Sequence, residues 1–385
     1  MYHALLAMGS RPTSIGVDRS EGRSAMTVVD DRTTAAVPNE WTAEGEGRLY
    51  RSLGWYWHPV MYASQLDDAP VQTTLLGRRV VVVRLAGEVR AFIDRCAHRG
   101  TAVSLGWVEG DCLRCPYHGW LYDDQGVCVE IPSRTDAVIS PRARLERLHA
   151  REANGLIYVC AAPEPRIDIP EFPEWSDDAF CKVAIPAYDW QAGAARRTEN
   201  FVDFSHFAWV HDGVLARRDQ PLVPDHEVRR EGWELRTRIV VDEPTNTSKT
   251  STLELESGST TVPGERNYRI ALPFTVWIHQ TLPAGQAFVL FMACQPVGPK
   301  ECRTFTFVAR NFGLEAPDES FIAHQQEIVE ADRVIAESQL PEELPTDLSE
   351  EMYVRGADQI SVEYRRWLLE LVEESEKAGG DVSDC

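Results

Sequence analysis

The chain has 385 residues and a formal net charge of −21, with 39 basic and 60 acidic side chains. Its length suits two domains or three small ones, and 43% apolar with 26% charged residues is typical of a globular protein. The acidity argues against non-specific binding to nucleic acid or to an anionic membrane, since both require a basic surface. Because the sequence has no membrane-length apolar run and no secretory signal pattern, we expect a cytoplasmic protein.

The first half of the chain predicts a β domain. Residues 1–45 are polar and lack apolar periodicity, so a flexible N-terminal arm is expected there. Residues 46–165 carry short apolar runs separated by turns, which is typical of antiparallel strands. Strands are predicted at 80–83, 89–93, 120–122 and 155–159. A proline-rich stretch, 163–173, then leads into a second domain at 166–385.

The second half predicts a sheet and helices. Helices are expected at 196–211, 321–338 and 359–376. Strands are predicted at 233–241, 268–278, 287–294 and 303–308. Long antiparallel strands followed by terminal helices indicate an α+β domain whose helices cover one face of the sheet. The charge is uneven: residues 76–151 have a balance of +3, and residues 315–385 have a balance of −15.

Nine cysteines are scattered over the chain, and four of them fall between positions 96 and 128. An odd, dispersed set is not a disulfide framework, so core packing or metal binding is expected. Cys96-Ala97-His98 is followed after sixteen residues by Cys115-Pro116-Tyr117-His118. Two such pairs can bind one zinc ion, or a [2Fe–2S] cluster with both cysteines on one iron and both histidines on the other. The single residue between Cys96 and His98 disfavours the usual zinc-finger pair.

This stretch resembles the Rieske [2Fe–2S] domain, which carries Cys-x-His-Arg-Gly and Cys-Pro-Tyr-His-Gly-Trp. The cysteines that form an extra disulfide in the Rieske proteins of respiratory complexes are replaced here by Gly100 and Tyr117. The sequence is therefore similar to the oxygenase and ferredoxin branch. The cluster ligands that the resemblance implies are Cys96, His98, Cys115 and His118.

A second group of chemistry-bearing side chains lies at 199–211. Asp203 and His206 are three residues apart and share one helix face. His211 lies five residues beyond His206, about 140° around an unbroken helix. The two imidazoles therefore converge only if the helix ends or bends between them; two surface histidines are an equal alternative. Beside an electron-carrying cluster, however, a His/His pair favours an O₂-activating Fe(II) site of two histidines and one carboxylate.

The arrangement resembles the α subunits of Rieske non-haem iron oxygenases, which carry Asn-x₂-Asp-x₂-His-x₄-His after the Rieske domain. The resemblance implies an N-terminal all-β domain and a C-terminal helix-grip (START-like) antiparallel sheet with a long C-terminal helix. His206 and His211 would bind a mononuclear Fe(II). An aspartate on a C-terminal helix would be the third ligand, and Asp332 is the best match because residues 334–335 are expected to pack its helix inward. The alternatives are Asp318 and Asp347.

The resemblance also gives Asp203 a role between subunits. In the family this carboxylate connects a cluster histidine of one subunit with an iron-binding histidine of the next. Asp203 would therefore link His118 of the partner subunit to His206, and a head-to-tail homotrimer is expected. Asn200 would lie near the iron, with an ordinary helix-surface amide as an equal alternative.

Electrons must come from another protein, because no glycine-rich nucleotide fingerprint follows a predicted strand. We expect a separate NAD(P)H-dependent reductase or ferredoxin. Arg95 and Arg114 are candidates for docking an acidic partner, whereas Arg99 is expected to be buried and to brace the cluster loops.

The length of the chain is similar to that of the compact α-only monooxygenases, such as the aromatic O-demethylases and aminopyrrolnitrin oxygenase. The resemblance implies O₂-dependent hydroxylation or oxidative demethylation of a small aromatic or natural-product substrate. The alternatives are a ring cis-dihydroxylating dioxygenase and an electron-transfer protein with a ligand-binding C-terminal domain. A polar lid is predicted at 243–248. The candidate pocket residues, for each of which core packing is the default alternative, are Phe207, Trp209, Leu272, Phe274, Val276 and His279.

Overall fold

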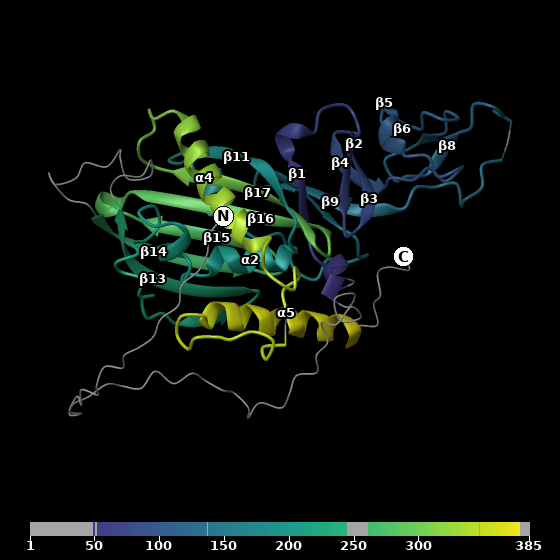
Figure 1. Ribbon diagram of the computed structural model, residues 1–385. Coiled ribbons are helices and arrows are strands. Elements are labelled where there is room, and N and C mark those ends of the chain that lie inside the picture. Colours follow the sequence, from purple (N-terminus) through teal and green to yellow (C-terminus); the bar gives the residue numbers. More distant parts are fainter. Residues whose placement is uncertain (1–48, 51, 137, 245–260, 346, 378–385) are drawn as a thin grey trace, which may run out of the picture.

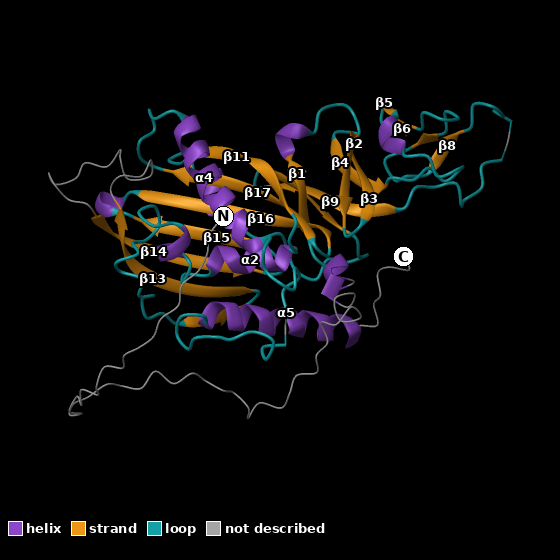
Figure 2. Cartoon of the chain, in the orientation of Figure 1, coloured by secondary structure: helices purple, strands orange, loops and turns teal. Residues whose placement is uncertain are grey.

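The computed structural model describes residues 49–377 except for residues 51, 137, 245–260 and 346 (Figure 1). The predicted arm at 1–45 and most of the predicted lid lie outside the described residues. Strands dominate both halves, and the long α-helices of the described residues belong to the second half (Figure 2). Within the described part of the chain, no helix combines the length and apolar character needed to cross a membrane.

The first half contains a six-stranded antiparallel sheet in the order β1-β10-β9-β4-β3-β2. Val80 to Val83 are fully buried because β3 is covered on both faces, which explains its continuous apolar run. Val81 and Val83 pack with Cys96 and Cys115, whereas Val80 packs on the opposite face. The strands are β1 (His58–Tyr62), β2 (Val71–Leu75), β3 (Arg78–Leu85), β4 (Glu88–Ile93), β9 (Arg147–Ala153) and β10 (Leu156–Cys160).

A small four-stranded sheet, in the order β5-β6-β7-β8, forms one end of the molecule (Figure 1). The predicted cluster ligands lie in the two loops beside it, one after β4 and one between β6 and β7. The strands are β5 (Trp107–Glu109), β6 (Cys112–Arg114), β7 (Leu121–Tyr122) and β8 (Cys128–Glu130). Short 3₁₀ helices in the chain are η1 (Leu53–Trp55), η2 (Ala63–Gln65), η3 (Val103–Leu105), η4 (Pro173–Ser176) and η5 (Pro283–Gly285).

The second half is built on a seven-stranded antiparallel sheet in the order β11-β17-β16-β15-β14-β13-β12. The helices lie over one face of this sheet, as the α+β prediction requires (Figure 1). The strands are β11 (Cys181–Trp190), β12 (Val228–Glu231), β13 (Glu234–Pro244), β14 (Thr261–Ala271), β15 (Thr275–Thr281), β16 (Ala287–Gly298) and β17 (Glu301–Arg310). The helices are α2 (Ala194–Val202), α3 (Phe207–Val210), α4 (Asp318–Ala336) and α5 (Gln359–Lys377).

Two elements that were each predicted to be continuous are divided in the structure. The strand expected at 268–278 is two strands, because the chain turns at residues 272–274 between β14 and β15. Pro273 in this turn has no N–H to donate to a sheet ladder, so a continuous strand is disfavoured. The helix expected at 196–211 is likewise α2 and α3, which are separated by residues 203–206.

Helix α2 is anchored by buried charge. Arg365 of α5 donates to both carboxylate oxygens of Glu199 at 2.6 Å, and both side chains are buried. Arg365 also donates to Glu351 at 2.7 Å and to the Tyr353 hydroxyl at 2.6 Å. Because an unpaired charge would be costly in this interior, the bidentate pair fixes α2 against α5.

The two halves share an aromatic core. Leu156 and Tyr158 of the first sheet pack with Phe291 and Phe307 of the second. The Tyr62 hydroxyl donates to the Ile185 carbonyl at 2.6 Å across this boundary. The domains are therefore joined by a packed interface.

Gly155 provides a test of this interface. Its φ is +73°, and an added Cβ would lie 2.3 Å from the Trp175 ring. We predict that Gly155→Ala lowers the free energy of unfolding by about 2–4 kcal/mol, through backbone strain plus overpacking. Gly77 is the matched control, because its φ is +70° but nothing lies within 4 Å of an added Cβ. Gly77→Ala should cost only about 1 kcal/mol in chemical denaturation, and equal losses for both variants would contradict the close packing.

Candidate functional site

The two histidines of the second motif converge because helix α2 ends before them. Asp203 is the C-cap of α2, and its Oδ1 accepts a hydrogen bond from the Ser205 N–H at 2.8 Å. The chain then enters the short helix α3, with His206 at its N-cap and His211 at its C-cap. The two imidazole centroids lie 5.2 Å apart. This is the interruption of the helix that the spacing of His206 and His211 requires if both are to share one site.

Asp332 of α4 completes a group of three. Its Oδ1 lies 2.7 Å from His211 Nε2 and 3.4 Å from His206 Nε2. One donor atom from each of the three side chains falls within 4.8 Å of the others. His211 and Asp332 are buried, and His206 is partly buried. Among the described residues this is the one set of three or more such side chains placed to hold a single ion.

The electrostatics of this group favour a cation. Burial disfavours a protonated His206, but hydrogen bonds to Asp203 and Asp332 outweigh it and raise the pKa of His206 to about 9. Burial also opposes ionisation of Asp332, yet His206, His211 and Arg197 hold its pKa well below its usual range. These surroundings thus stabilise the ionised carboxylate of Asp332 and a positive charge beside it. Two imidazoles and one carboxylate are a donor set that suits non-haem Fe(II).

The competing carboxylates lie elsewhere. Asp318 pairs with Arg310 at 3.2 Å, and Asp347 caps the Ser349 N–H at 2.8 Å. The prediction that residues 334–335 pack this helix inward is wrong, however. Residues 334–335 are about half exposed, and α4 turns a different face inward. That buried face consists of Phe321, Gln325, Asp332 and Ala336.

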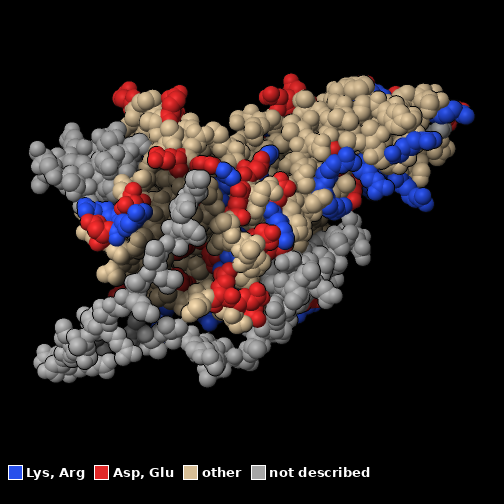
Figure 3. All heavy atoms as spheres, in the orientation of Figure 1, with Lys and Arg blue, Asp and Glu red and all other residues tan. Residues whose placement is uncertain are grey.

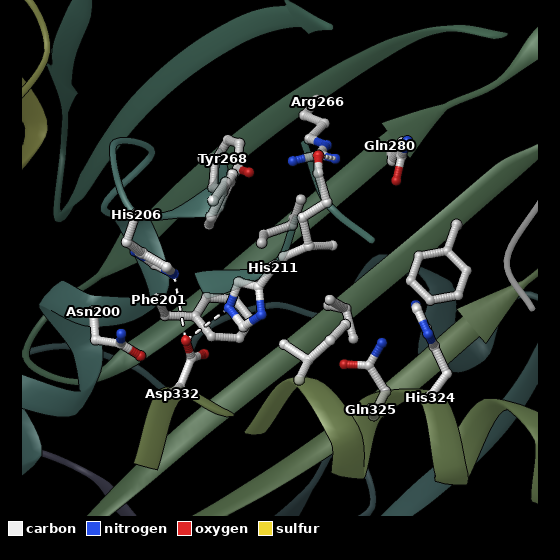
Figure 4. Close-up of a pocket in the computed structure, with 16 residues that line it drawn as sticks. Asn200, Phe201, His206, His211, Arg266, Tyr268, Gln280, His324, Gln325 and Asp332 are labelled. Carbon is white, nitrogen blue, oxygen red and sulfur yellow. Dashed lines mark hydrogen bonds and ion pairs between the residues drawn. The ribbon is translucent and has the colours of Figure 1, made fainter. Parts of the chain in front are cut away.

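Asp203 and Asn200 flank the three side chains. Asp203 Oδ2 lies 3.2 Å from His206 Nδ1, which leaves Nε2 of that ring facing Asp332. The Asp203 side chain is 35% exposed, so it can contact both the ring and a molecule outside the chain. Asn200 lies beside Asp332 at the wall of the adjoining cavity (Figure 4).

A cavity of about 610 Å³ opens from His206, His211 and Asp332 between the sheet and α4 (Figure 4). Its far wall is polar, because Arg266 of β14 and Gln280 of β15 are cross-strand neighbours there. The remaining wall is mainly apolar, and the residues are Phe201, Phe207, Leu215, Ile278, Phe288, Leu290 and Ile328.

Of the six predicted pocket residues, Phe207 alone lines this cavity. Three others, Leu272, Phe274 and Val276, are buried in the main core. Trp209 is 57% exposed, and His279 lies 3.4 Å from Glu174. The missed residues follow regular spacings that carried a usable signal. Arg266 and Tyr268 alternate along β14, and Gln325, Ile328 and Asp332 are spaced as one helix face.

The other predicted constellation is also assembled. His98 Nδ1 and His118 Nδ1 are 3.1 Å apart, so the two imidazoles face one point. Burial raises the pKa of the Cys115 thiol, as does its hydrogen bond with Cys96. The cysteines are therefore paired with each other and the histidines with each other, as a cluster with two different irons requires. Trp120 stacks on His98 at 4.6 Å.

The arginines near these loops differ from expectation. Arg99 is exposed, not buried, and so is Arg95. Arg114 is instead tied to Glu109 at 2.6 Å and Glu130 at 3.1 Å, so it braces the loop rather than offering a free cation. Figure 3 shows Lys and Arg side chains gathered along one edge of the N-terminal domain.

Comparison with known proteins identifies both halves. A model described as the Rieske [2Fe-2S] domain matches residues 56–144, and one described as the vanillate O-demethylase oxygenase C-terminal domain matches residues 190–374. Methylxanthine N3-demethylase NdmB of Pseudomonas putida is 34% identical over 334 residues, which cover 82% of this chain and 88% of NdmB. Methylxanthine N1-demethylase NdmA of the same organism is 33% identical, with 83% and 89% covered.

Solved structures agree. NdmA of Pseudomonas putida with caffeine superposes with a TM-score of 0.75 at 30% identity, covering 86% of this chain and 94% of NdmA. Dicamba monooxygenase, at 19% identity and a TM-score of 0.71, shares the fold over 84% of this chain and 99% of its own. The chain therefore belongs to the Rieske non-haem iron oxygenases, as an oxygenase (α) subunit that carries a [2Fe–2S] cluster and a mononuclear iron and works with O₂ and a separate reductase or ferredoxin.

Proposed function

We propose that this oxygenase removes N- or O-methyl groups oxidatively from a small aromatic or heteroaromatic substrate. The observation that carries the proposal is the group of His206, His211 and Asp332 at one end of a mainly apolar cavity. The relatives over most of the chain are methylxanthine N-demethylases, and the C-terminal family model is that of a vanillate O-demethylase. Both act on methyl groups carried by a small ring, which supports this assignment.

We assign the mononuclear iron to His206, His211 and Asp332, and the cluster to Cys96, His98, Cys115 and His118. Iron held at the first site and supplied with electrons by the cluster would activate O₂. The chain itself performs the positioning. Asp203 holds His206 by its Nδ1, so that Nε2 is presented to the site.

The cavity would select and orient the substrate. Its apolar wall, including Phe207 and Ile328, excludes water and holds a ring with a methyl group toward the metal site. The guanidinium of Arg266 and the carboxamide of Gln280, on the far wall, would meet ring oxygens or nitrogens. A substrate anchored at that wall presents its opposite edge to His206 and Asp332.

We further propose a head-to-tail homotrimer in which the cluster of one chain meets the iron of the next. Within one chain the cluster loops lie at the far end of the molecule from α2 and α4 (Figure 1). Beside Asp203 is a polar hollow of about 700 Å³ that also contains Asp358 and Glu351, with Met352 on its rim.

The cluster end has the complementary surface. Arg95 and Arg99 are exposed there, together with the apolar side chains of Leu105, Trp107 and Tyr117. Exposed apolar groups and opposite charges are what an interface between copies of the chain needs. An NAD(P)H-dependent donor works where NAD(P)H is made, so we assign the enzyme to the cytoplasm.

Iron analysis tests the ligand assignment. We predict that Asp332→Ala keeps the cluster but loses the mononuclear iron, so that about three irons per chain fall to about two. Asp318→Ala is the control from the same helix, and it should retain all three. Metal analysis with EPR of the reduced cluster measures both. Retention of the third iron by Asp332→Ala would overturn the assignment.

Product analysis tests the reaction. With a suitable reductase, O₂ and a panel that includes caffeine, theobromine and methoxybenzoates, we expect formaldehyde in about a 1:1 ratio to O₂ consumed with the accepted substrate. Oxidative loss of a methyl group must release its carbon as formaldehyde. A ring cis-diol without formaldehyde would instead identify a dihydroxylating dioxygenase.

Sedimentation tests the assembly. We expect the wild type to sediment at three times the mass of the chain. Tyr117, which is 62% exposed beside the cluster ligand His118, should lie in the interface, so Tyr117→Asp should dissociate the trimer and abolish activity. Val240→Asp, at an exposed apolar position on β13, is the control and should remain trimeric. A monomeric wild type with full activity would refute the trimer.

A further inference from the structure

Directly behind the three clustered side chains, helix α2 carries an arginine with no exposed surface. Arg197 is 0% exposed, and it lies one helical turn before Asn200. Its guanidinium stacks over the Trp190 ring at 4.3 Å and the Phe201 ring at 5.1 Å. A cation in such a place is expensive unless it is compensated. Its presence therefore calls for a specific reason.

The groups that accept hydrogen bonds from Arg197 are uncharged. Nη2 and Nε donate to the Tyr188 hydroxyl at 2.7 and 3.3 Å, and Nη1 donates to Asn200 Oδ1 at 2.8 Å. No carboxylate within the described part of the chain accepts a hydrogen bond from it. The charge is nevertheless retained. Burial works against the cation, but Tyr188 and then Asp332 outweigh it, so the pKa of Arg197 stays above its ordinary value.

The contact with Asn200 fixes the direction of that amide. A guanidinium has only donors, so it can face only the oxygen of a carboxamide. The Asn200 Nδ2 group must therefore point away from Arg197, and Figure 4 shows Asn200 beside Asp332 at the cavity wall. The contact with Arg197 thereby fixes the orientation of the Asn200 carboxamide at the cavity wall.

We propose that Arg197 is a positioning residue of the iron site, which fixes the orientation of the Asn200 carboxamide beside Asp332 and places a permanent positive charge near Asp332. The proposal rests on the assignment of iron to His206, His211 and Asp332. Its role is electrostatic as well as steric, because the buried positive charge of Arg197 lowers the pKa of Asp332.

A fixed positive charge near a metal favours the reduced, less positive state. Arg197 would therefore raise the midpoint potential of the mononuclear Fe(III)/Fe(II) couple and keep the site ferrous in readiness for O₂. A purely structural role for Arg197 would not predict this change in potential. It would affect thermal stability and metal occupancy without a directed change in potential.

The test is an EPR-monitored redox titration of the iron-loaded holoenzyme. Arg197→Met should lower the midpoint potential of the mononuclear iron, while Arg197→Lys, which keeps the charge, should stay near the wild-type value. Arg196→Met is the matched control. Arg196 is a buried arginine on the same helix, but it bonds to the Pro341 and Glu343 carbonyls and to Glu351. Its loss should reduce thermal stability and leave the potential unchanged.

The role of Asn200 has a separate test, which does not depend on whether Arg197→Met folds. Asn200→Leu keeps the cation, so the potential should remain near wild type. The EPR signal of the ferrous–nitric oxide complex should change, because the oriented carboxamide beside the metal-binding side chains is lost. Equal potentials for Arg197→Met and Arg196→Met, or an unaltered nitric oxide signal in Asn200→Leu, would overturn the inference. A wild type without mononuclear iron would instead refute the proposed function.

Discussion

Two histidines five residues apart can bind one ion only if the helix between them is interrupted, and the catalytic domain is organised to maintain that interruption. Helix α2 ends at Val202, Asp203 turns the chain, and the short helix α3 places His206 and His211 at its two ends. The buried Arg365–Glu199 pair fixes α2, while α4 brings Asp332 to 2.7 Å from His211. The site therefore depends both on the local break between α2 and α3 and on the packing of α4 and α5 against them.

The same segment joins the site to its surroundings. Asp203 connects the interior to a polar hollow on the surface, because it holds His206 on one side and remains partly exposed on the other. Asn200 and Arg197 extend the polar contacts inward from the same helix. The net charge of −21 is misleading as an average, because the cluster domain is mildly basic and the C-terminal segment is strongly acidic.

The sequence was most informative where the chemistry is local. The Cys-x-His and Cys-x₂-His pairs are each set by one loop, and the spacing of His206 and His211 made a helix break the condition for a shared site. The family and its cofactors followed from these motifs. Asp332 came from the resemblance, and the packing reason attached to it was wrong, because residues 334–335 face outward.

The pocket residues could be predicted only in part, because spacing shows which residues share a face but not which face lines a cavity. That depends on sheet register, and the turn at Pro273 divides the predicted strand 268–278 into two strands. Arg266 and Gln280 become neighbours only through the pairing of β14 with β15. The burial of Arg197 could not be predicted from the sequence either, because a charged residue on a polar helix is expected to face solvent unless tertiary packing is known.

Function in this chain requires two iron centres, for which seven side chains are proposed as ligands. The most direct measurement is an anomalous difference map at the iron edge, from crystals of anaerobically purified protein. A two-iron peak among Cys96, His98, Cys115 and His118, and a single iron peak among His206, His211 and Asp332, is the predicted result. An empty second site, or zinc in place of the cluster, would contradict it.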